Sequence, residues 1–323
     1  MNFNKSVFFG ALLIILIGWN CSGPEEKTVF SKIPFPKDNP ITAEKIAFGK
    51  RLFFDKRLSR NNEMSCATCH RPDKAFTDGL PKSKGVNGAL AMRNAPSILN
   101  SSYFKRYMYD GEVKTLEEQV LVPIQDHREM GSSMKEVLRK LSKDSRYREL
   151  AKSIFNRELD AYVVTRAIST YERSLISRSS RFDRYRAGEK TALNANELAG
   201  WKLFSEKLYC TKCHPAPDFT NYRVLSNGLY RDYGTDQGRF RINGEEKEKG
   251  TFKVPSLRNV SLTAPYMHDG SMKTLKEVIL HYSNGGADHP NKSAIIQRFS
   301  LTDLEINQLC SFLETLVDTS GVN

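Results

Sequence analysis

A five-residue pattern occurs twice in this 323-residue chain, and it restricts the possible folds more than any other feature. The two copies are Cys66-Ala67-Thr68-Cys69-His70 and Cys210-Thr211-Lys212-Cys213-His214. In a C-x-x-C-H run both thiols can bond to a porphyrin while the histidine ligates its iron, which is how c-type haem is attached. Six cysteines and six histidines would give roughly 0.002 such runs by chance. A redox dithiol or a zinc site would not need histidine in both copies, so we predict two covalently bound haem c groups.

Other segments also repeat between the halves of the chain. Residues 107–116 (YMYDGEVKTL) match residues 266–275 (YMHDGSMKTL) at an offset of 159, and Arg93-Asn94 matches Arg258-Asn259 at an offset of 165. Each half therefore has a haem motif, an Arg-Asn pair and a Y-M-x-D-G turn in the same order. Such a repeat predicts two similar haem domains that arose by internal duplication.

Helical patterns dominate the chain after its first residues. Apolar residues recur at helical spacing at 42–54, 115–122, 134–155, 159–177, 196–208, 274–282 and 302–316. Threonine stands at the N-cap position of four of these segments, namely Thr42, Thr115, Thr274 and Thr302. Pro123 is expected to end the second segment. Alternating β patterns are scarce, so we predict a mainly α fold, with the arginine-rich stretch 179–189 as a linker between domains.

The N-terminal residues form a separate segment. Lys5 precedes an apolar stretch at 7–19, which would be about 20 Å long as a helix. This is too short for a bilayer core of about 30 Å, so residues 1–21 are predicted to be an export signal. Cys21 follows that stretch and resembles the lipid-modified cysteine of bacterial lipoproteins, although residues 18–20 match the usual small-residue motif poorly. Lipidation or simple cleavage nearby would both give a periplasmic protein, with membrane contact only through the lipid anchor.

Composition excludes several other classes of protein. Hydrophobic residues make up 39% of the chain, which is enough for buried cores. The net charge of +12 fits an acidic partner, but the basic residues form no known nucleic-acid module, so we expect no nucleic-acid binding. The basic run 178–186 is interpreted as a solvated helix end. Cys310 lies in an apolar stretch and is expected to be a small buried residue.

From about Ile33 to Leu316 the chain resembles the bacterial di-haem cytochrome c peroxidase family, including its MauG-type branch. The resemblance depends on the segments FGKRLFFDKRLS, RNAPSILN, YDGEVKTLEEQ, REMG and FKVPSLRNVSLTAPYMHDG. It implies two cytochrome-c-like haem domains, at 22–187 and 188–323. Peroxide would react at the N-terminal haem, with His70 on its iron, and electrons would enter at the C-terminal haem, with His214 on its iron.

The resemblance also implies a calcium ion between the domains. Its ligands would be Asn94 and the backbone oxygens of Thr263 and Pro265. For Asn94, the alternative is an ordinary turn residue.

Cleavage of the peroxide O–O bond moves a proton from the inner to the outer oxygen, and therefore needs a general acid–base beside the iron. The resemblance implies that Glu129, in the segment REMG, has this role, and that Gln119 is the polar residue of the same pocket. Without the resemblance, Glu129 would be one of 37 acidic residues and a surface position would be the simpler interpretation. His127 is an alternative base, although a rim position suits it better.

The chain departs from the classical peroxidases of this family on the side of the first haem. After a DGLP segment, those enzymes carry a histidine that caps the iron at rest, whereas the matching position here is Val86. Valine cannot ligate iron, so we expect the first iron to be open unless the loop brings in Lys84 or Met92. Tyr109 replaces the tryptophan between the haems, and it can still relay electrons because tyrosine is oxidisable.

The second haem also differs from the usual pattern. Its sixth ligand is usually a methionine, but counting from His268 places Tyr282 there, as in the MauG branch. A hard phenolate ligand favours the higher oxidation state of iron. Met267, Met272 and His281 are alternatives, as is a core position for Tyr282.

These features predict an enzyme that reduces hydrogen peroxide to water with electrons from a small donor protein, either a c-type cytochrome or a cupredoxin. One alternative is a MauG-like enzyme that uses peroxide to oxidise a partner protein. Another is a non-enzymatic electron carrier, which Val86 and Glu129 disfavour because a carrier needs neither an open iron nor an acid–base group. Whether the protein forms a homodimer stays open.

Overall fold

Side-chain caps set where the main helices begin. The Thr42 side chain accepts a hydrogen bond from the backbone N–H of Lys45, and α2 (Ala43–Phe53) follows directly. α12 (Leu275–Ser283) begins after Thr274 in the same way, and α13 (Asp303–Glu314) after Thr302. These side chains satisfy backbone donors that the first helical turn leaves unpaired. The N-caps predicted from the sequence are confirmed at these helices.

The structure is a computed structural model that describes residues 33–318 and residue 320. The other helices of the first half are α3 (Cys66–Cys69), α4 (Leu116–Gln119), α5 (Leu121–Gln125), α6 (Met134–Leu141), α7 (Ser145–Phe155) and α8 (Ala161–Ser174). Those of the second half are α9 (Arg181–Arg186), α10 (Ala195–Lys202) and α11 (Phe240–Asn243). Strands β1 (Val224–Leu225) and β2 (Phe252–Lys253) pair antiparallel, with Val224 opposite Lys253. The prediction of a mainly helical fold is confirmed.

The predicted export signal at 1–21, including Cys21, lies outside the described residues. Among the helices that the structure describes, none is both long enough and apolar enough to cross a membrane.

Three helical segments differ from the prediction. Pro123 does not end a helix, because it lies in the first turn of α5, where its missing N–H would have no helical partner. The segment 134–155 is two helices, α6 and α7, and the Asp144 side chain caps the second. The stretch 179–189 is not an open linker, because it holds α9 and the buried side chain of Phe182.

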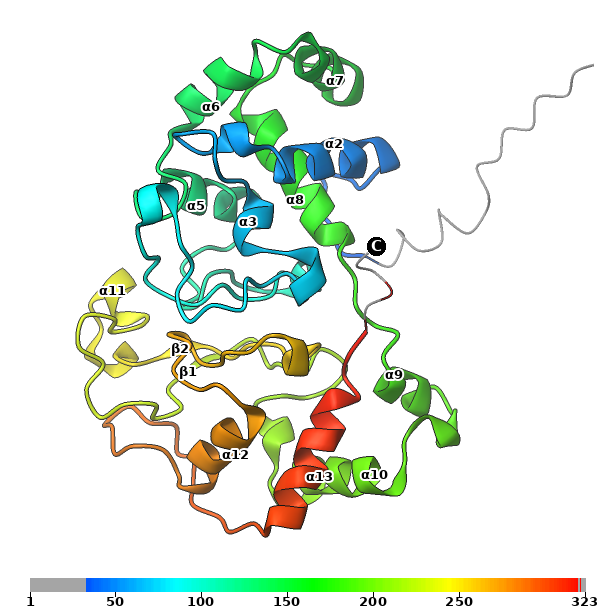
Figure 1. Cartoon of the computed structure of the whole chain (residues 1–323), viewed down its shortest axis with the longest axis vertical. Coiled ribbons are helices and arrows are strands. Elements are labelled where there is room, and N and C mark those ends of the chain that lie inside the picture. Colours follow the sequence, from blue (N-terminus) through cyan, green and yellow to red (C-terminus); the bar gives the residue numbers. More distant parts are fainter. Residues whose placement is uncertain (1–32, 319, 321–323) are drawn as a thin grey trace, which may run out of the picture. The chain divides into compact units, whose positions relative to one another are not determined.

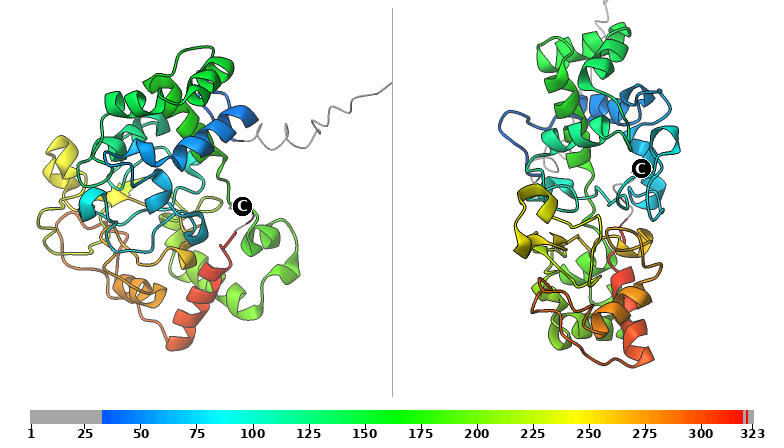
Figure 2. Two further views of the ribbon diagram at one scale, coloured as in Figure 1. Left: turned by 45° about the horizontal axis from the view of Figure 1, so that its top comes forward. Right: turned by 90° about the vertical axis from the view of Figure 1, so that its left-hand side faces the viewer.

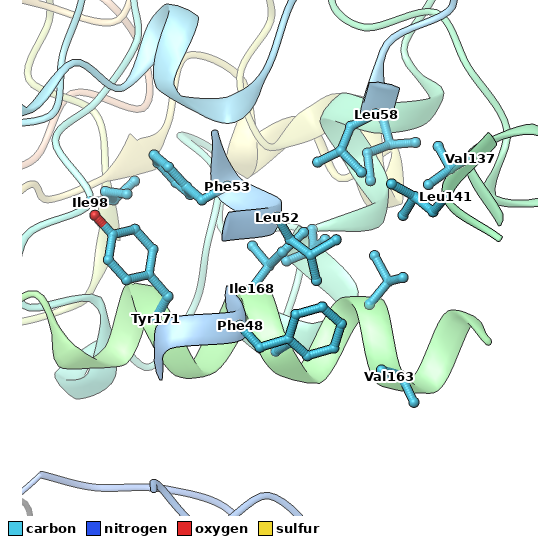
Figure 3. Packing of buried hydrophobic residues seen from close by; sticks show 14 of the residues in the cluster. Phe48, Leu52, Phe53, Leu58, Ile98, Val137, Leu141, Val163, Ile168 and Tyr171 are labelled. Carbon is cyan, nitrogen blue, oxygen red and sulfur yellow. The ribbon is translucent and has the colours of Figure 1, made fainter. Parts of the chain in front are cut away.

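The first half packs around the crossing of α2 and α8 (Figure 3). This core contains Phe48, Leu52 and Phe53 from α2, and Val163, Ile168 and Tyr171 from α8. Gly49 allows the two helices to approach closely, because a Cβ at this position would lie 1.9 Å from the carbonyl oxygen of Ala167. The core therefore fixes the chain on both sides of the first haem motif.

The second half has the same kind of crossing between α10 and α13. A Cβ at Gly200 would lie 1.9 Å from the carbonyl oxygen of Gln308. The core around this crossing is aromatic and contains Phe182, Trp201, Phe204, Phe219 and Phe312. Cys310 is half-buried against it, not fully buried as predicted. Because Phe182 belongs to this core, the predicted domain boundary after residue 187 would fit better a few residues earlier.

Residues from Ile33 onward group into one compact unit, and direct bonds join its two halves. The backbone N–H of Asn94 donates to the carbonyl of His268 at 2.8 Å, and that of Lys253 donates to the carbonyl of Tyr109 at 2.6 Å. Strands β1 and β2 lie between the helices of the first half and helices α12 and α13 (Figures 1 and 2). The repeated Y-M-x-D-G segments thus meet the opposite half of the molecule.

Candidate functional site

The first haem motif forms α3 and the turn that follows it. The backbone N–H of His70 donates to the carbonyl of Cys66 at 2.9 Å, and this bond fixes where the imidazole leaves the chain. Nδ1 of His70 lies 3.0 Å from the carbonyl oxygen of Phe76. Because a carbonyl can only accept, Nδ1 carries the proton and Nε2 is left for iron. Burial lowers the pKa of His70, which keeps the imidazole neutral, as an iron ligand must be.

The second motif repeats this geometry. The backbone N–H of His214 donates to the carbonyl of Cys210 at 2.8 Å. Nδ1 of His214 lies 2.9 Å from the carbonyl oxygen of Phe219, and burial again lowers the pKa of the imidazole. In both histidines Nδ1 therefore carries the proton, and Nε2 is left to bind iron.

A cavity of about 1000 Å³ reaches both motifs. Its wall includes Cys69 and His70 of the first motif and Cys210, Cys213 and His214 of the second, and most of the wall is apolar. None of the four motif cysteines is in a disulfide, so all four side chains are available for attachment of a porphyrin. Two thiols and a neutral imidazole beside an apolar cavity are the donor set that haem c requires, so the residues of both motifs fit the group. Within the described part of the chain, no three His, Cys, Asp or Glu side chains are grouped so that they could hold a metal ion.

Glu129 is half-buried on the wall of this cavity, in the turn after α5. Cys69 and His70 of the first motif line the same cavity. Burial and the Asp78 carboxylate raise the pKa of the Cys69 thiol, and the charge of Glu129 adds a smaller effect. Burial and the nearby Asp126 carboxylate raise the pKa of Glu129 to about 7, although the Arg128 guanidinium opposes the shift. The group can therefore both take up and release a proton near neutral pH.

Gln119 and Tyr109 line the same cavity as Glu129. The Tyr109 hydroxyl donates to Oδ1 of Asn94 at 3.1 Å, and burial raises the pKa of this phenol. His127, the alternative base, has a side chain that is 78% exposed and does not line the cavity. The geometry thus favours Glu129 over His127 as the acid–base group.

Val86 does not occupy the position expected from the sequence. Its backbone N–H donates to the carbonyl of Glu129 at 2.8 Å, and its side chain packs against Gly131, so Gly85 and not Val86 lines the cavity. Of the two alternative ligands from this loop, Met92 lines the cavity and Lys84 does not. The segment 82–92 contains no histidine. Its residues on the cavity wall are Ser83, Gly85, Ala91 and Met92.

The far side of the second motif contains two of the four candidate ligands. Met267 and Tyr282 both line the cavity, and Nδ2 of Asn227 lies 3.5 Å from the sulfur of Met267 and 3.5 Å from the hydroxyl of Tyr282. His281 instead donates from Nε2 to the carbonyl of Asn227 at 3.1 Å, and neither it nor Met272 lines the cavity. Tyr282 stays the predicted ligand, with Met267 as its rival.

Known proteins share this architecture. Residues 43–191 match the family model described as di-haem cytochrome c peroxidase. Over 286 residues the chain is 37% identical to the methylamine utilization protein MauG of Methylorubrum extorquens, covering 88% of this chain and 81% of that protein. The chain belongs to the di-haem cytochrome c peroxidase family. It is also 33% identical over 287 residues to cytochrome c551 peroxidase of Nitrosomonas europaea, covering 88% of this chain and 83% of the relative.

A solved structure of another family member has the same fold. It is a MauG-like protein associated with microbial copper homeostasis, with a TM-score of 0.84 and 35% identity, and the match covers 94% of this chain and 97% of that one. Membership of this di-haem family implies two c-type haems, in agreement with the two motifs.

The predicted calcium ligands of this family member also face the cavity. Asn94 donates from Nδ2 to the carbonyl of Leu80 at 2.7 Å and accepts at Oδ1 from Tyr109. Within the described residues, the carbonyl oxygens of Thr263 and Pro265 accept no backbone hydrogen bond. Calcium stays a prediction.

The Arg-Asn pair is repeated in the sequence, but no function was predicted for its arginine, which is Arg93 in the first half and Arg258 in the second. The repeat itself was the signal. Arg93 pairs with Asp110 of its own half at 2.9 Å and with Asp236 of the other half at 2.6 Å, and Arg258 pairs with Asp183 at 2.8 Å. For Asn227, no sequence pattern could have predicted its contact with two candidate ligands.

Proposed function

We propose that this chain is an exported di-haem peroxidase that reduces hydrogen peroxide to water. Electrons come from a small redox protein, enter at the C-terminal haem and pass to the N-terminal haem. The observation that carries the proposal is the Glu129 carboxyl, which lines the same cavity as Cys69 and His70 and whose pKa burial raises to about 7.

The haem, when bound, supplies the redox chemistry of peroxide cleavage. Glu129 as a carboxylate takes the proton from the inner oxygen of peroxide and returns it to the outer oxygen, which leaves as water. The Gln119 amide, on the same wall, orients the peroxide by hydrogen bonding. Burial, with smaller and opposed effects of Asp126 and Arg128, raises the Glu129 pKa to about 7, where both protonation states are populated near neutral pH.

Tyr109 lies on the route between the two halves. Its carbonyl accepts the backbone N–H of Lys253, and its hydroxyl binds Asn94, whose own N–H donates to His268. These bonds support a role for Tyr109 as the relay between the two sites.

Donor stoichiometry tests the proposed function. Holoprotein mixed with a reduced c-type cytochrome or cupredoxin and limiting peroxide should oxidise two donors for each peroxide consumed. A holoprotein with both haems loaded that oxidises no donor above the uncatalysed background would contradict the proposal.

A MauG-like reaction on a partner protein is the second candidate. The pair of Tyr282 and Met267 beside Asn227 favours it, because a phenolate ligand on the second haem would make that haem a poor acceptor of electrons from an ordinary carrier. The donor assay separates the two candidates: a MauG-like enzyme reacts with peroxide but turns over the small donor slowly.

The two halves are further proposed to derive from one duplicated haem domain. Three features occur in both halves: the histidine–carbonyl bond, the glycine at the helix crossing, and a methionine with left-handed backbone angles, which is Met108 in the first half and Met267 in the second.

A calcium ion bound by Asn94 and by the carbonyl oxygens of Thr263 and Pro265 is a further proposal. Metal analysis of the holoprotein before and after chelation tests it. Lipidation of Cys21 is tested by labelling with a fatty acid, which Cys21→Ser should abolish.

A further inference from the structure

A second buried acid faces the cavity, and the proposed mechanism does not use it. Glu172 lies in α8, is 5% exposed and lines the cavity wall. Within the described residues its Oε2 has no hydrogen-bond partner. An ionised carboxylate with an unpaired oxygen is unfavourable in such a place, so the side chain is more stable with a proton bound.

The neighbours of Glu172 leave its charge uncompensated. Arg173, the next residue in α8, donates to both oxygens of Glu117 at 2.6 and 2.8 Å and is therefore already paired. The Tyr107 hydroxyl donates to the carbonyl of Ser101 at 3.0 Å. Burial, with a smaller effect of Glu117, raises the pKa of Glu172 to about 8, although Arg173 opposes it.

The charge of Glu172 acts directly on the first haem motif. Burial is the largest cause of the raised pKa of the Cys66 thiol, and the negative charge of an ionised Glu172 is the next largest. Cys66 is one of the two attachment points of the first haem, so the carboxyl and the porphyrin would share one apolar space. In that space the charges of the two groups interact more strongly than in water.

We propose that Glu172 is the redox-linked proton site of the first haem. While that haem is oxidised, its positive charge stabilises the carboxylate form of Glu172. When the haem gains an electron, this positive charge is lost, and Glu172 takes up a proton from solvent. When the haem is oxidised, the proton leaves. One proton therefore accompanies one electron, which keeps the net charge of the cavity constant, and peroxide reduction consumes protons and electrons in the same ratio.

The reduction potential of the first haem, measured against pH, tests this proposal. In the wild type the potential should fall as the pH rises through about 8, the pKa of the buried acid. Glu172→Gln has the same shape but cannot ionise, so its potential should stay at the low-pH value. The two haems are resolved by following the visible spectrum and the EPR signals together.

Glu129→Gln is the matched control, because Glu129 also lines this cavity and has a raised pKa of about 7. It should keep the change near pH 8. A change that persists in Glu172→Gln, or a wild-type potential that is independent of pH, would overturn the proposal.

A second measurement does not depend on the Glu172 variant. In infrared difference spectra of the Glu129→Gln protein, reduction should produce a carboxylic-acid C=O band and oxidation should remove it. Absence of the band would also overturn the proposal. The inference rests on haem attachment at Cys66 and Cys69 but not on peroxide reduction. Neither measurement uses peroxide, so a protein that titrates as expected but fails the donor assay would contradict only the proposed function.

Discussion

The two halves of this molecule hold their haem motifs in the same way but differ on the far side of the cavity. Near each motif, the histidine donates to a backbone carbonyl at 2.9–3.0 Å, and a glycine allows a close helix crossing. Beyond the first motif, the wall presents the proton-binding side chain of Glu129 and the amide of Gln119. Beyond the second, it presents the potential iron ligands Met267 and Tyr282. We therefore propose that a shared scaffold attaches the cofactor, while a few wall residues decide between reaction with peroxide and electron transfer.

The largest effect is expected when one haem is removed at a time, because this tests directly whether the two halves have different roles. Replacing Cys66 and Cys69 by alanine should halve the haem content and abolish the reaction with peroxide. Replacing Cys210 and Cys213 should also halve it, yet leave a peroxide reaction at the first haem and abolish turnover with a donor. The pyridine haemochrome assay gives the haem content, and stopped-flow spectra give the reaction. A rapid peroxide reaction in the first variant would show that the two sites are assigned the wrong way round.

The next largest effect is expected at Glu129. Glu129→Gln should slow peroxide cleavage by about 10²-fold or more, because the amide cannot move the proton, while the spectra of both haems stay unchanged. His127→Gln is the matched control: it lies two residues away with an exposed side chain and should have no effect. An unaltered rate in Glu129→Gln would move the acid–base role elsewhere.

The raised pKa of Glu129 predicts a pH dependence for the first site alone. The carboxylate is the form that accepts the peroxide proton, so the rate should rise with pH and level off above about 7. Below that pH it should fall by about tenfold per unit, as the carboxylate fraction does. The rate of donor binding, which concerns the second half, should not show this step. A flat profile between pH 5 and about 8 would exclude Glu129 as the base.

At the second site, exchange of a candidate ligand should change spectra more than peroxide chemistry. Tyr282→Phe should alter the EPR signal and the reduction potential of the second haem, because a phenyl ring cannot bind iron. Met267→Leu is the paired variant, since both side chains lie 3.5 Å from Nδ2 of Asn227. The rate of peroxide cleavage at the first haem should stay the same in both. If Met267→Leu alone changes the signal, methionine is the ligand.

The sequence predicted the parts of the fold and site that depend on local pattern. The haem motifs, the threonine caps and the helical class follow from spacing and side-chain chemistry within one segment. Pro123 was misjudged because a proline can begin a helix as well as end one, and only the neighbouring turn decides which. Glu172 and Asn227 were not found because their roles depend on burial and on contacts between distant segments, and no short pattern encodes these.

The smallest effect is expected at Val86, where the structure revised the sequence prediction. In the classical peroxidases a histidine at the aligned position caps the first iron, and the alignment alone predicts that Val86→His converts an open site into a closed one. The Val86 side chain, however, is 4% exposed and packs against Gly131, and its backbone is bonded to Glu129. Histidine there should therefore leave the first haem high-spin and directly reactive with peroxide. It should instead lower the free energy of unfolding by about 1–3 kcal/mol, because a larger polar ring enters a packed space. EPR of the oxidised protein and thermal unfolding test the two effects separately. A low-spin first haem that reacts only after reduction would show that this loop can turn its side chain into the cavity.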